Sequence, residues 1–144
     1  MTSDEKGSIA EAEIVAAATR LGVPVLKPVN DGLRYDLAFD LADRILRVQC
    51  KWAPKRGDCI IVSSCTSRRG PEGFIRSTYS SADVDLVAAY CAAVDACYAI
   101  PIDRLAGRPS MRLRLSPTRN NQQKGVNWAR DFAFAATLQQ LVGP

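Results

Sequence analysis

Apolar and polar residues alternate most clearly in the middle of the chain, in the stretch 44-RILRVQCKWA-53. The even positions from 46 to 52 are apolar and the odd positions are polar, a period of two that is typical of a β-strand. One face of this predicted strand is therefore apolar, and the other carries Arg47, Gln49 and Lys51. What the polar face contacts depends on the elements around it.

A helical pattern precedes the strand and predicts a helix over residues 4–21. Ser3 or Asp4 can cap its start, and Gly22 ends it. Apolar residues follow Glu11 at spacings of three and four, so its side chain is expected to point toward the protein interior. A carboxylate placed there needs a partner, because burying it unpaired is costly.

Several other runs have the composition of strands. The longest polar segment between them, residues 65–81, is expected to form a loop. A second helix is expected over residues 126–141. The predicted strands cover residues 23–29, 35–41, 44–53, 58–64, 86–91, 95–102 and 111–116. This order predicts one domain over residues 1–144 of the α/β or α+β class, with a mixed central β-sheet flanked by helices.

The strands over residues 35–41 and 44–53 are close enough in sequence to form a hairpin around Ala42. If the hairpin is symmetric, the numbers of facing residues sum to 85, and Asp36 faces Gln49 with Cβ atoms about 5 Å apart. Lys51 lies on the same face as Gln49. A one-residue bulge would break this pairing, since Ala-Asp is not a favoured tight turn.

The composition agrees with a folded domain. Of the 144 residues, 47% are hydrophobic and 24% are charged. A chain of this length buries roughly two thirds of its unfolded surface and needs no disulfide or metal to stabilise it. No apolar run approaches the roughly 20 residues of a membrane span, and the start MTSDEKGS is unlike a signal peptide. We therefore expect a soluble, cytoplasmic protein with no membrane partner.

The sequence has five cysteines and no histidine. The cysteines are odd in number and form no Cys-x-x-Cys pair, so we expect buried, reduced thiols rather than zinc ligands or disulfides. The absence of histidine excludes Ser-His-Asp and Cys-His catalysis and histidine-bound zinc in their usual forms. Acid, base or metal chemistry must then come from carboxylates, amides and lysines.

Glu11, Asp36, Gln49 and Lys51 are the candidates for such chemistry. Two carboxylates and an amide oxygen are the hard ligands that suit Mg²⁺, with Mn²⁺ as a substitute, and no organic cofactor is needed. A metal there would polarise a phosphoryl oxygen and activate water, while Lys51 would orient that water or offset developing charge. The alternative is a surface salt bridge beside a solvated strand face.

The net charge of +4 is unevenly distributed. Residues 1–43 hold four basic and eight acidic side chains, and residues 44–76 hold eight and two. Residues 77–103 hold no basic and four acidic side chains, and residues 104–130 hold seven and none. Two basic segments brought onto one face would bind a phosphate backbone, whereas scattered ones would only keep the surface soluble.

Several fragments occur together in an informative order: 7-GSIAE-11, 35-YD-36, 48-VQCKW-52, 83-DVDLVAAY-90, 98-YAIPID-103, 113-LRLSPTRNNQ-122 and 128-WARDF-132. In this order they resemble the PD-(D/E)XK nuclease superfamily. They look closest to its group I intron-encoded homing endonucleases and related small phage and bacterial proteins, with Holliday junction resolvases more distant. The resemblance implies a restriction-endonuclease-like core and a metal-dependent DNA endonuclease that hydrolyses phosphodiester bonds.

The resemblance also implies roles for individual residues. Asp36 and Gln49 match the metal-binding positions before the hairpin and two residues before the lysine. The backbone carbonyl of Cys50 matches a third metal ligand, Lys51 matches the catalytic lysine, and Glu11 matches the helix carboxylate. These residues are the predicted active site.

Two positions depart from the family pattern. Tyr35 stands where the named motif has proline, a common change in this superfamily. Gln49 replaces the second acidic residue and removes one negative charge from the metal site. The intron-encoded branch tolerates glutamine here, so activity is expected. The alternative is a weak or inactive site in a protein of the same fold that recognises DNA structure without cutting it.

Predicted DNA contacts lie in the two basic segments. They are Arg47, Lys55, Arg56, Arg68, Arg69, Arg76, Arg119, Asn120, Asn121, Gln122 and Lys124. The alternatives are that the arginines of residues 65–81 only keep a loop soluble, and that residues 119–122 cap the closing helix. One site per chain implies a homodimer or higher homo-oligomer if both DNA strands are cut. The sequence leaves open the DNA target and whether the gene belongs to a phage or another mobile element.

Overall fold

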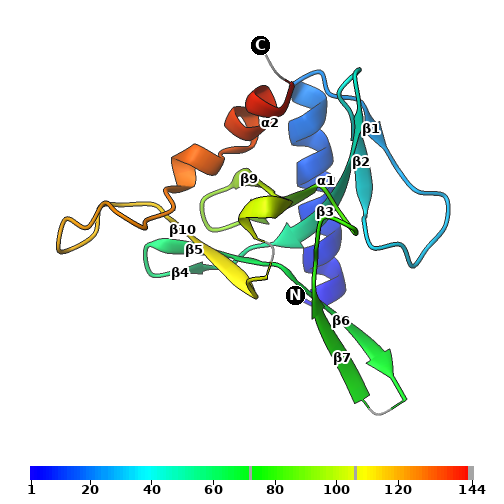
Figure 1. The fold of residues 1–144 in the computed structure, drawn as a ribbon, viewed down its shortest axis with the longest axis horizontal. Helices are drawn as coiled ribbons and strands as arrows, with labels where there is room; N and C mark the ends of the chain where they lie inside the picture. Colours follow the sequence, from blue (N-terminus) through cyan, green and yellow to red (C-terminus); the bar gives the residue numbers. More distant parts are fainter. Residues whose placement is uncertain (72, 106, 143–144) are drawn as a thin grey trace.

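The computed structural model describes residues 1–71, 73–105 and 107–142, and for residues 66–70 and 74–76 only the backbone. Two α-helices and ten strands are present in these residues (Figure 1). The helices are α1 (Ser3–Arg20) and α2 (Phe134–Val142), with short 3₁₀ helices η1 (Ile102–Arg104) and η2 (Ala129–Phe132). The strands are β1 (Val25–Leu26), β2 (Leu37–Asp40), β3 (Ile45–Trp52), β4 (Lys55–Arg56), β5 (Cys59–Ser63), β6 (Cys65–Gly70), β7 (Gly73–Thr78), β8 (Leu86–Cys91), β9 (Ala96–Pro101) and β10 (Ser110–Arg114).

The central sheet has five strands in the order β1-β2-β3-β8-β9. Strands β3 and β8 are parallel and the other neighbours are antiparallel, so the predicted mixed sheet is confirmed. A three-stranded sheet, β10-β5-β4, and the hairpin β6-β7 lie beside it. In Figure 1 this hairpin and the segment between β10 and η2 project from the body of the protein.

The β2–β3 hairpin has the predicted register. Leu37 faces Val48, and each further pair of facing residues also sums to 85. The turn is made possible by Ala42, whose φ of 77° is the positive value that a tight hairpin turn requires at its first central position. The Asp40 carboxylate accepts a hydrogen bond of 2.9 Å from the Ala42 N–H and so stabilises this unusual conformation.

The sheet is buried on both faces, since its centre packs between two groups of apolar side chains. Leu86 and Ala88 of β8 face α1 and α2, whereas Val87 and Ala89 face β5, β10 and the 3₁₀ helices. In the helix-side cluster the rings of Phe39 and Phe134 meet edge to face at 5.9 Å. All six residues of β8 are buried, as expected for a central strand with both faces covered.

The ends of α1 follow from its sequence. Thr2, rather than Ser3 or Asp4, is the N-cap, and it forms a capping box with Glu5. The helix ends before Gly22, whose φ of 76° is a conformation that glycine adopts at little cost. None of the described helices is long and apolar enough to cross a membrane.

Two predicted elements are wrong. Residues 65–81 do not form a loop, because β6 and β7 pair as antiparallel strands. The first facing pair is Cys65 with Thr78, and the last is Gly70 with Gly73. Glycine, proline and consecutive polar residues interrupt this segment, so its sequence lacks the apolar–polar alternation that indicates a strand. The closing helix starts at Phe134 instead of residue 126, because Ala133 is extended and bridges to Tyr98 at the sheet edge.

All five cysteines are free, but the expectation that they are buried is wrong for three of them. Cys59 and Cys91 are buried, whereas the other three are partly exposed. The structure therefore holds together by packing and hydrogen bonding without a disulfide.

Replacing Phe39 with Ala is expected to lower the free energy of unfolding by about 3–5 kcal/mol, because a fully buried ring leaves a cavity. Urea or guanidinium denaturation at neutral pH measures this loss. Ile45→Ala on the adjacent strand is the matched control, since Ile45 is 56% exposed and its loss is expected to cost less than about 1 kcal/mol. Equal losses in the two variants would contradict the placement of Phe39 in the core.

Candidate functional site

The site begins where β3 extends past its neighbour. Strand β2 pairs with β3 only as far as Val48, so the next part of β3 has a free edge on that side. Asp36, just before β2, reaches this edge, and its Oδ2 accepts a 2.9 Å hydrogen bond from the Cys50 N–H. The N–H and C=O of one strand residue point to the same side, so the Cys50 carbonyl opens toward the same edge.

Asp36 is partly removed from water in this position. Burial raises the pKa of its carboxyl, the Cys50 N–H lowers it, and the nearby Glu11 carboxylate raises it. The charges of Lys51 and Lys27 lower the pKa of Asp36 by smaller amounts. The effect of Glu11 shows that two carboxylates lie close enough to repel each other, an arrangement that a nearby cation stabilises.

Glu11 projects from α1 toward this edge and finds a partner there. Its Oε1 lies 2.8 Å from the Nζ of Lys27, just past β1, and the Glu11 side chain is 27% exposed. The expectation that Glu11 needs a partner is confirmed, and in this structure the partner is Lys27. A cavity of about 220 Å³ is lined by Glu11, Lys27, Tyr35 and Asp36 together with the loop that follows Lys27.

Lys51 lies on the opposite face of β3 from Cys50 and is held by the base of the β6–β7 hairpin. Its Nζ donates a 2.8 Å hydrogen bond to the carbonyl of Cys65, the first residue of β6. The same ammonium lies 5.1 Å from the ring centre of Tyr79, which directly follows β7. Burial lowers the pKa of Lys51, whereas the charge of Asp36 acts to raise it.

Gln49 is half-buried on the same face of β3 as Lys51 and pairs with Val87 of β8. The Asp36 N–H donates to the Val48 carbonyl at 2.9 Å, so Asp36 contacts β3 through the residues on either side of Gln49. The fold thus brings Asp36 to the end of β3 that carries Gln49 and Lys51. Glu11 lines the same cavity as Asp36, whereas Gln49 and Lys51 are not among the residues that line it.

Comparison with known proteins identifies the family. The sequence pattern of the PD-(D/E)XK endonuclease family matches residues 1–135 of the chain. The chain belongs to this family. No curated protein matches it in sequence. A solved structure of a bacterial homing endonuclease, I-Ssp6803I, is similar to it, with a TM-score of 0.76 and 28% identity over 99% of this chain and 96% of that one.

The predicted family and fold class are confirmed by these similarities. The protein is therefore an endonuclease of a kind that acts on DNA. Strands β2, β3 and β8 are neighbours in the sheet, and Asp36 and Lys51 lie at one end of β3.

The oxygen donors of this endonuclease suit a hard divalent cation. Glu11 and Asp36 supply two carboxylates to one cavity, and the Cys50 carbonyl lies at the strand edge beside Asp36. Within the described part of the chain, no cluster of three or more His, Cys, Asp or Glu side chains could hold a metal ion. A pair of carboxylates with a neutral oxygen beside it fits an ion such as Mg²⁺, which uses one or two carboxylates and keeps several waters.

Arg47, predicted to contact DNA, already has several partners within the protein. Its guanidinium donates to both carboxylate oxygens of Asp85, at 3.2 Å each, and to the carbonyls of Ser81 and Ala82. The Arg47 N–H also donates to Asp85 at 2.8 Å. We therefore assign Arg47 a role in joining β3 to the segment before β8.

The other predicted DNA contacts lie on exposed segments. Lys55 and Arg56 form the exposed strand β4, and Arg119 and Lys124 are exposed in the segment between β10 and η2. Asn120 and Gln122 hydrogen-bond within that segment and do not cap α2, so the capping alternative is wrong. Arg68, Arg69 and Arg76 belong to strands β6 and β7, but their side chains lie outside the described part of the structure.

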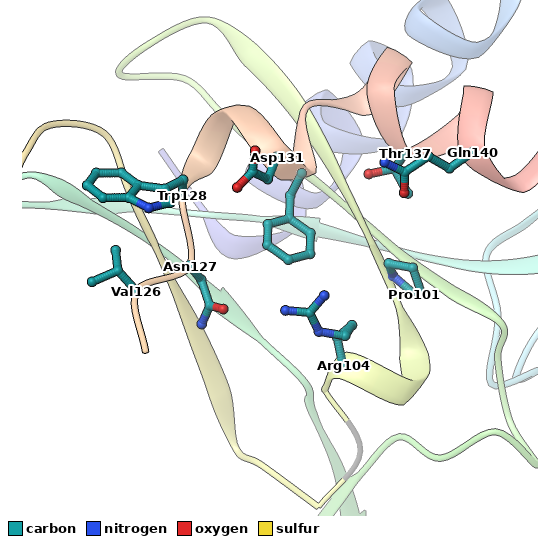
Figure 2. A pocket seen from close by; sticks show the side chains of 9 residues that line it. Pro101, Arg104, Val126, Asn127, Trp128, Asp131, Thr137 and Gln140 are labelled. Atoms are coloured by element: carbon teal, nitrogen blue, oxygen red, sulfur yellow. The ribbon is translucent and has the colours of Figure 1, made fainter. Parts of the chain in front are cut away.

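A second cavity of about 210 Å³ lies between η1, η2 and α2 (Figure 2). Figure 2 shows Arg104 across this cavity from Asp131. The Arg104 guanidinium also lies 5.1 Å from the ring centre of Phe132. None of the predicted active-site residues lines this cavity, and it offers a single carboxylate, so it lacks a donor set for a divalent metal.

Two residues at the site were missed by the sequence analysis. Lys27 lies in a run predicted as a strand, and no local pattern indicates that it faces Glu11 of a different element. Tyr79 belongs to the segment that was expected to be a loop. Only the pairing of β6 with β7 places Tyr79 beside Lys51.

Asp85→Asn is expected to lower the free energy of unfolding at neutral pH, because Arg47 loses its charged partner. Burial acts to raise the pKa of Asp85, but the hydrogen bonds and charge of Arg47, with a smaller effect of Arg44, lower it. The contribution is therefore present above the unfolded pKa of about 3.9 and is lost as pH falls through the lower folded value.

Urea denaturation between neutral pH and about pH 3 tests this dependence. The difference between the wild type and Asp85→Asn is expected to shrink at the acid end. Asp103→Asn, at an exposed aspartate, is the control and is expected to show little difference at any pH. A difference for Asp85→Asn that stays constant down to low pH would contradict the assigned pairing.

Proposed function

We propose that this endonuclease hydrolyses DNA phosphodiester bonds in a metal-dependent reaction with Glu11, Asp36, Gln49 and Lys51 at its active site. The observation that carries the proposal is the hydrogen bond from the Cys50 N–H to the Asp36 carboxylate. It directs a carboxylate toward the free edge of β3, beside the residues that match the family motif. Glu11 completes a pair of carboxylates around the same cavity.

Asp36, Gln49, Glu11 and the Cys50 carbonyl would hold Mg²⁺, with Mn²⁺ as a substitute. Such an ion supplies polarisation of the phosphoryl oxygen and a bound water of lowered pKa. The protein orients Asp36 through a backbone N–H that is part of the sheet, so this carboxylate is in place before the substrate arrives. Gln49 contributes a neutral oxygen, which makes the site less negative than one with two acidic residues on these strands.

Lys51 would stabilise the negative charge that develops on the scissile phosphate and orient the attacking water. Its Cys65 and Tyr79 contacts hold the ammonium in one place, which reduces the entropy lost in the transition state. Its lowered pKa reflects a partly dehydrated environment, in which a charge interacts more strongly with the phosphate.

DNA binding is proposed for the basic residues of the two projecting segments and β4. The hairpin β6–β7 and the segment before η2 extend from the body in Figure 1, where a duplex can reach them. Lys55, Arg56, Arg119 and Lys124 are exposed there or nearby. Their electrostatic attraction to phosphates is independent of sequence and gives general affinity for DNA. Because each chain holds one site, cutting both strands requires at least a homodimer.

A second candidate function is a DNA-structure-binding module of the same fold with a weak or inactive site. Gln49 favours it, because replacement of an acidic ligand by an amide lowers the negative charge available to a cation. The two functions differ in one outcome, cleavage, and the same assay separates them.

Lys51→Ala is expected to reduce cleavage at least about 100-fold, because it removes the charge that stabilises the transition state. The assay incubates protein with supercoiled plasmid, linear duplex or a four-way junction, in Mg²⁺ or in EDTA. Lys6→Ala is the matched control, since Lys6 is an exposed lysine of α1, and its cleavage is expected to equal that of the wild type. Binding without cleavage by the wild type would favour the module.

Gln49→Glu is expected to tighten divalent-cation binding by about tenfold, because it adds a negative charge within reach of the metal. Titration calorimetry with Ca²⁺ in the absence of DNA measures the affinity. Gln139→Glu, on an exposed position of α2, adds the same charge elsewhere and is expected to leave the affinity unchanged. Equal affinities for Gln49→Glu and the wild type would show that residue 49 does not contact the cation.

A further inference from the structure

Lys27 lines the cavity together with Glu11 and Asp36, and it is not one of the residues that match the family motif. Its Nζ is 2.8 Å from Glu11 Oε1. The hydrogen bond to Glu11 and the charge of Glu11 raise the pKa of Lys27, and Asp36 acts in the same direction. The ammonium therefore compensates both carboxylates of the proposed metal site.

We propose that Lys27 is a further functional residue of this site. It neutralises Glu11 while no cation is bound, and it transfers to a DNA phosphate when a divalent cation takes the carboxylate. This inference rests on the proposed function, because it assumes that Glu11 and Asp36 hold the cation.

The ion pair and a metal compete for the same oxygen atoms. A divalent cation binds a carboxylate oxygen at about 2.1 Å. An ammonium that stays in contact with the same carboxylate would then lie within a few ångström of two positive charges, and like charges at that distance repel strongly. Binding of the cation to Glu11 therefore displaces Lys27.

Lys27 is free to move, in contrast to Lys51. The Lys27 side chain is 69% exposed, and its ammonium is joined to one carboxylate on a flexible four-carbon stem. Lys51 is half-buried, donates to the Cys65 carbonyl and lies against Tyr79. The two lysines thus have different roles. Lys51 stays fixed beside β3, and Lys27 moves from the Glu11 carboxylate to the phosphate of the substrate.

The destination follows from charge. Apart from Lys27, none of the described residues that line the cavity is basic. Glu11 and Asp36 hold the cation in this proposal, and a pair with the exposed Asp31 would be weak, so the displaced ammonium gains most from a new anion. The anion that enters this site during the reaction is the DNA backbone. A lysine and a phosphate form a charge-assisted hydrogen bond, which offsets the lost pair with Glu11.

The first test measures cation affinity without DNA. Ca²⁺ titration calorimetry is applied to the wild type, Lys27→Gln, Glu11→Gln, Asp36→Asn and the double variant of Lys27→Gln with Glu11→Gln. Lys27→Gln is expected to tighten Ca²⁺ binding by about threefold or more, because the competing ion pair is gone. In the Glu11→Gln background the same substitution is expected to have a much smaller effect, since the pair is already broken.

Lys6→Gln is the matched control, because it removes the same charge from an exposed lysine of α1 that is not paired with Glu11. Its effect on Ca²⁺ affinity reports the general change in net charge. If Lys27→Gln and Lys6→Gln change the affinity equally, or if Lys27→Gln weakens binding, the inference is overturned. Thermal melts of each variant verify that the fold is retained.

The second test measures the transfer to DNA. Fluorescence anisotropy follows duplex binding at several salt concentrations in Lys51→Ala, a background that prevents cleavage. Addition of Ca²⁺ is expected to increase the number of phosphate contacts by about one, seen as a steeper salt dependence, and Lys27→Gln is expected to abolish that increase. An equal increase with and without Lys27 overturns the transfer step.

The set of variants separates the inference from the proposed function. If Glu11→Gln and Asp36→Asn weaken Ca²⁺ binding while Lys27→Gln behaves as Lys6→Gln does, only the inference fails. If Glu11→Gln and Asp36→Asn leave Ca²⁺ binding unchanged, the cation does not bind between them, and both the proposed site and the inference fail.

Discussion

The hydrogen bond from the Cys50 N–H to the Asp36 carboxylate connects the sheet to the acidic cavity. Strand β2 stops pairing at Val48, and a half-buried backbone N–H beyond that point needs an acceptor. Asp36 satisfies it with a side chain, and so the carboxylate takes its direction from the backbone of β3. The pairing that forms the core therefore also sets the geometry of the site, and any shift of register would change both.

The site combines groups that are costly to bring together. Burial opposes the charged forms of Asp36 and Lys51, and Glu11 adds a second negative charge near the first. The positive charges of Lys27 and Lys51 offset the negative charges of Glu11 and Asp36. A balanced but partly dehydrated cluster is suited to chemistry on phosphate, because folding has already removed part of the water around its charged groups.

The base of the β6–β7 hairpin holds Lys51 in position. Its first residue accepts the hydrogen bond of Lys51, and Tyr79, directly after its second strand, lies against the same ammonium. Arg34 contacts Ser77 and lies 5.6 Å from the Tyr79 ring, so the loop that lines the cavity also meets the base of the hairpin. The projecting hairpin, Lys51 and the loop that lines the cavity are therefore joined by one small set of contacts.

The sequence by itself determined the alternation in β3, the apolar runs of β8 and β9, and the symmetric pairing that sets Asp36 beside β3. These could be predicted because a period of two residues and a short connection are local properties of the chain. The pair of Glu11 with Lys27, the engagement of Arg47 by Asp85 and the contact of Lys51 with Tyr79 were decided only by the tertiary structure. Each joins residues from separate elements, and their meeting depends on how the helix and the hairpin pack against the sheet, which no local pattern encodes.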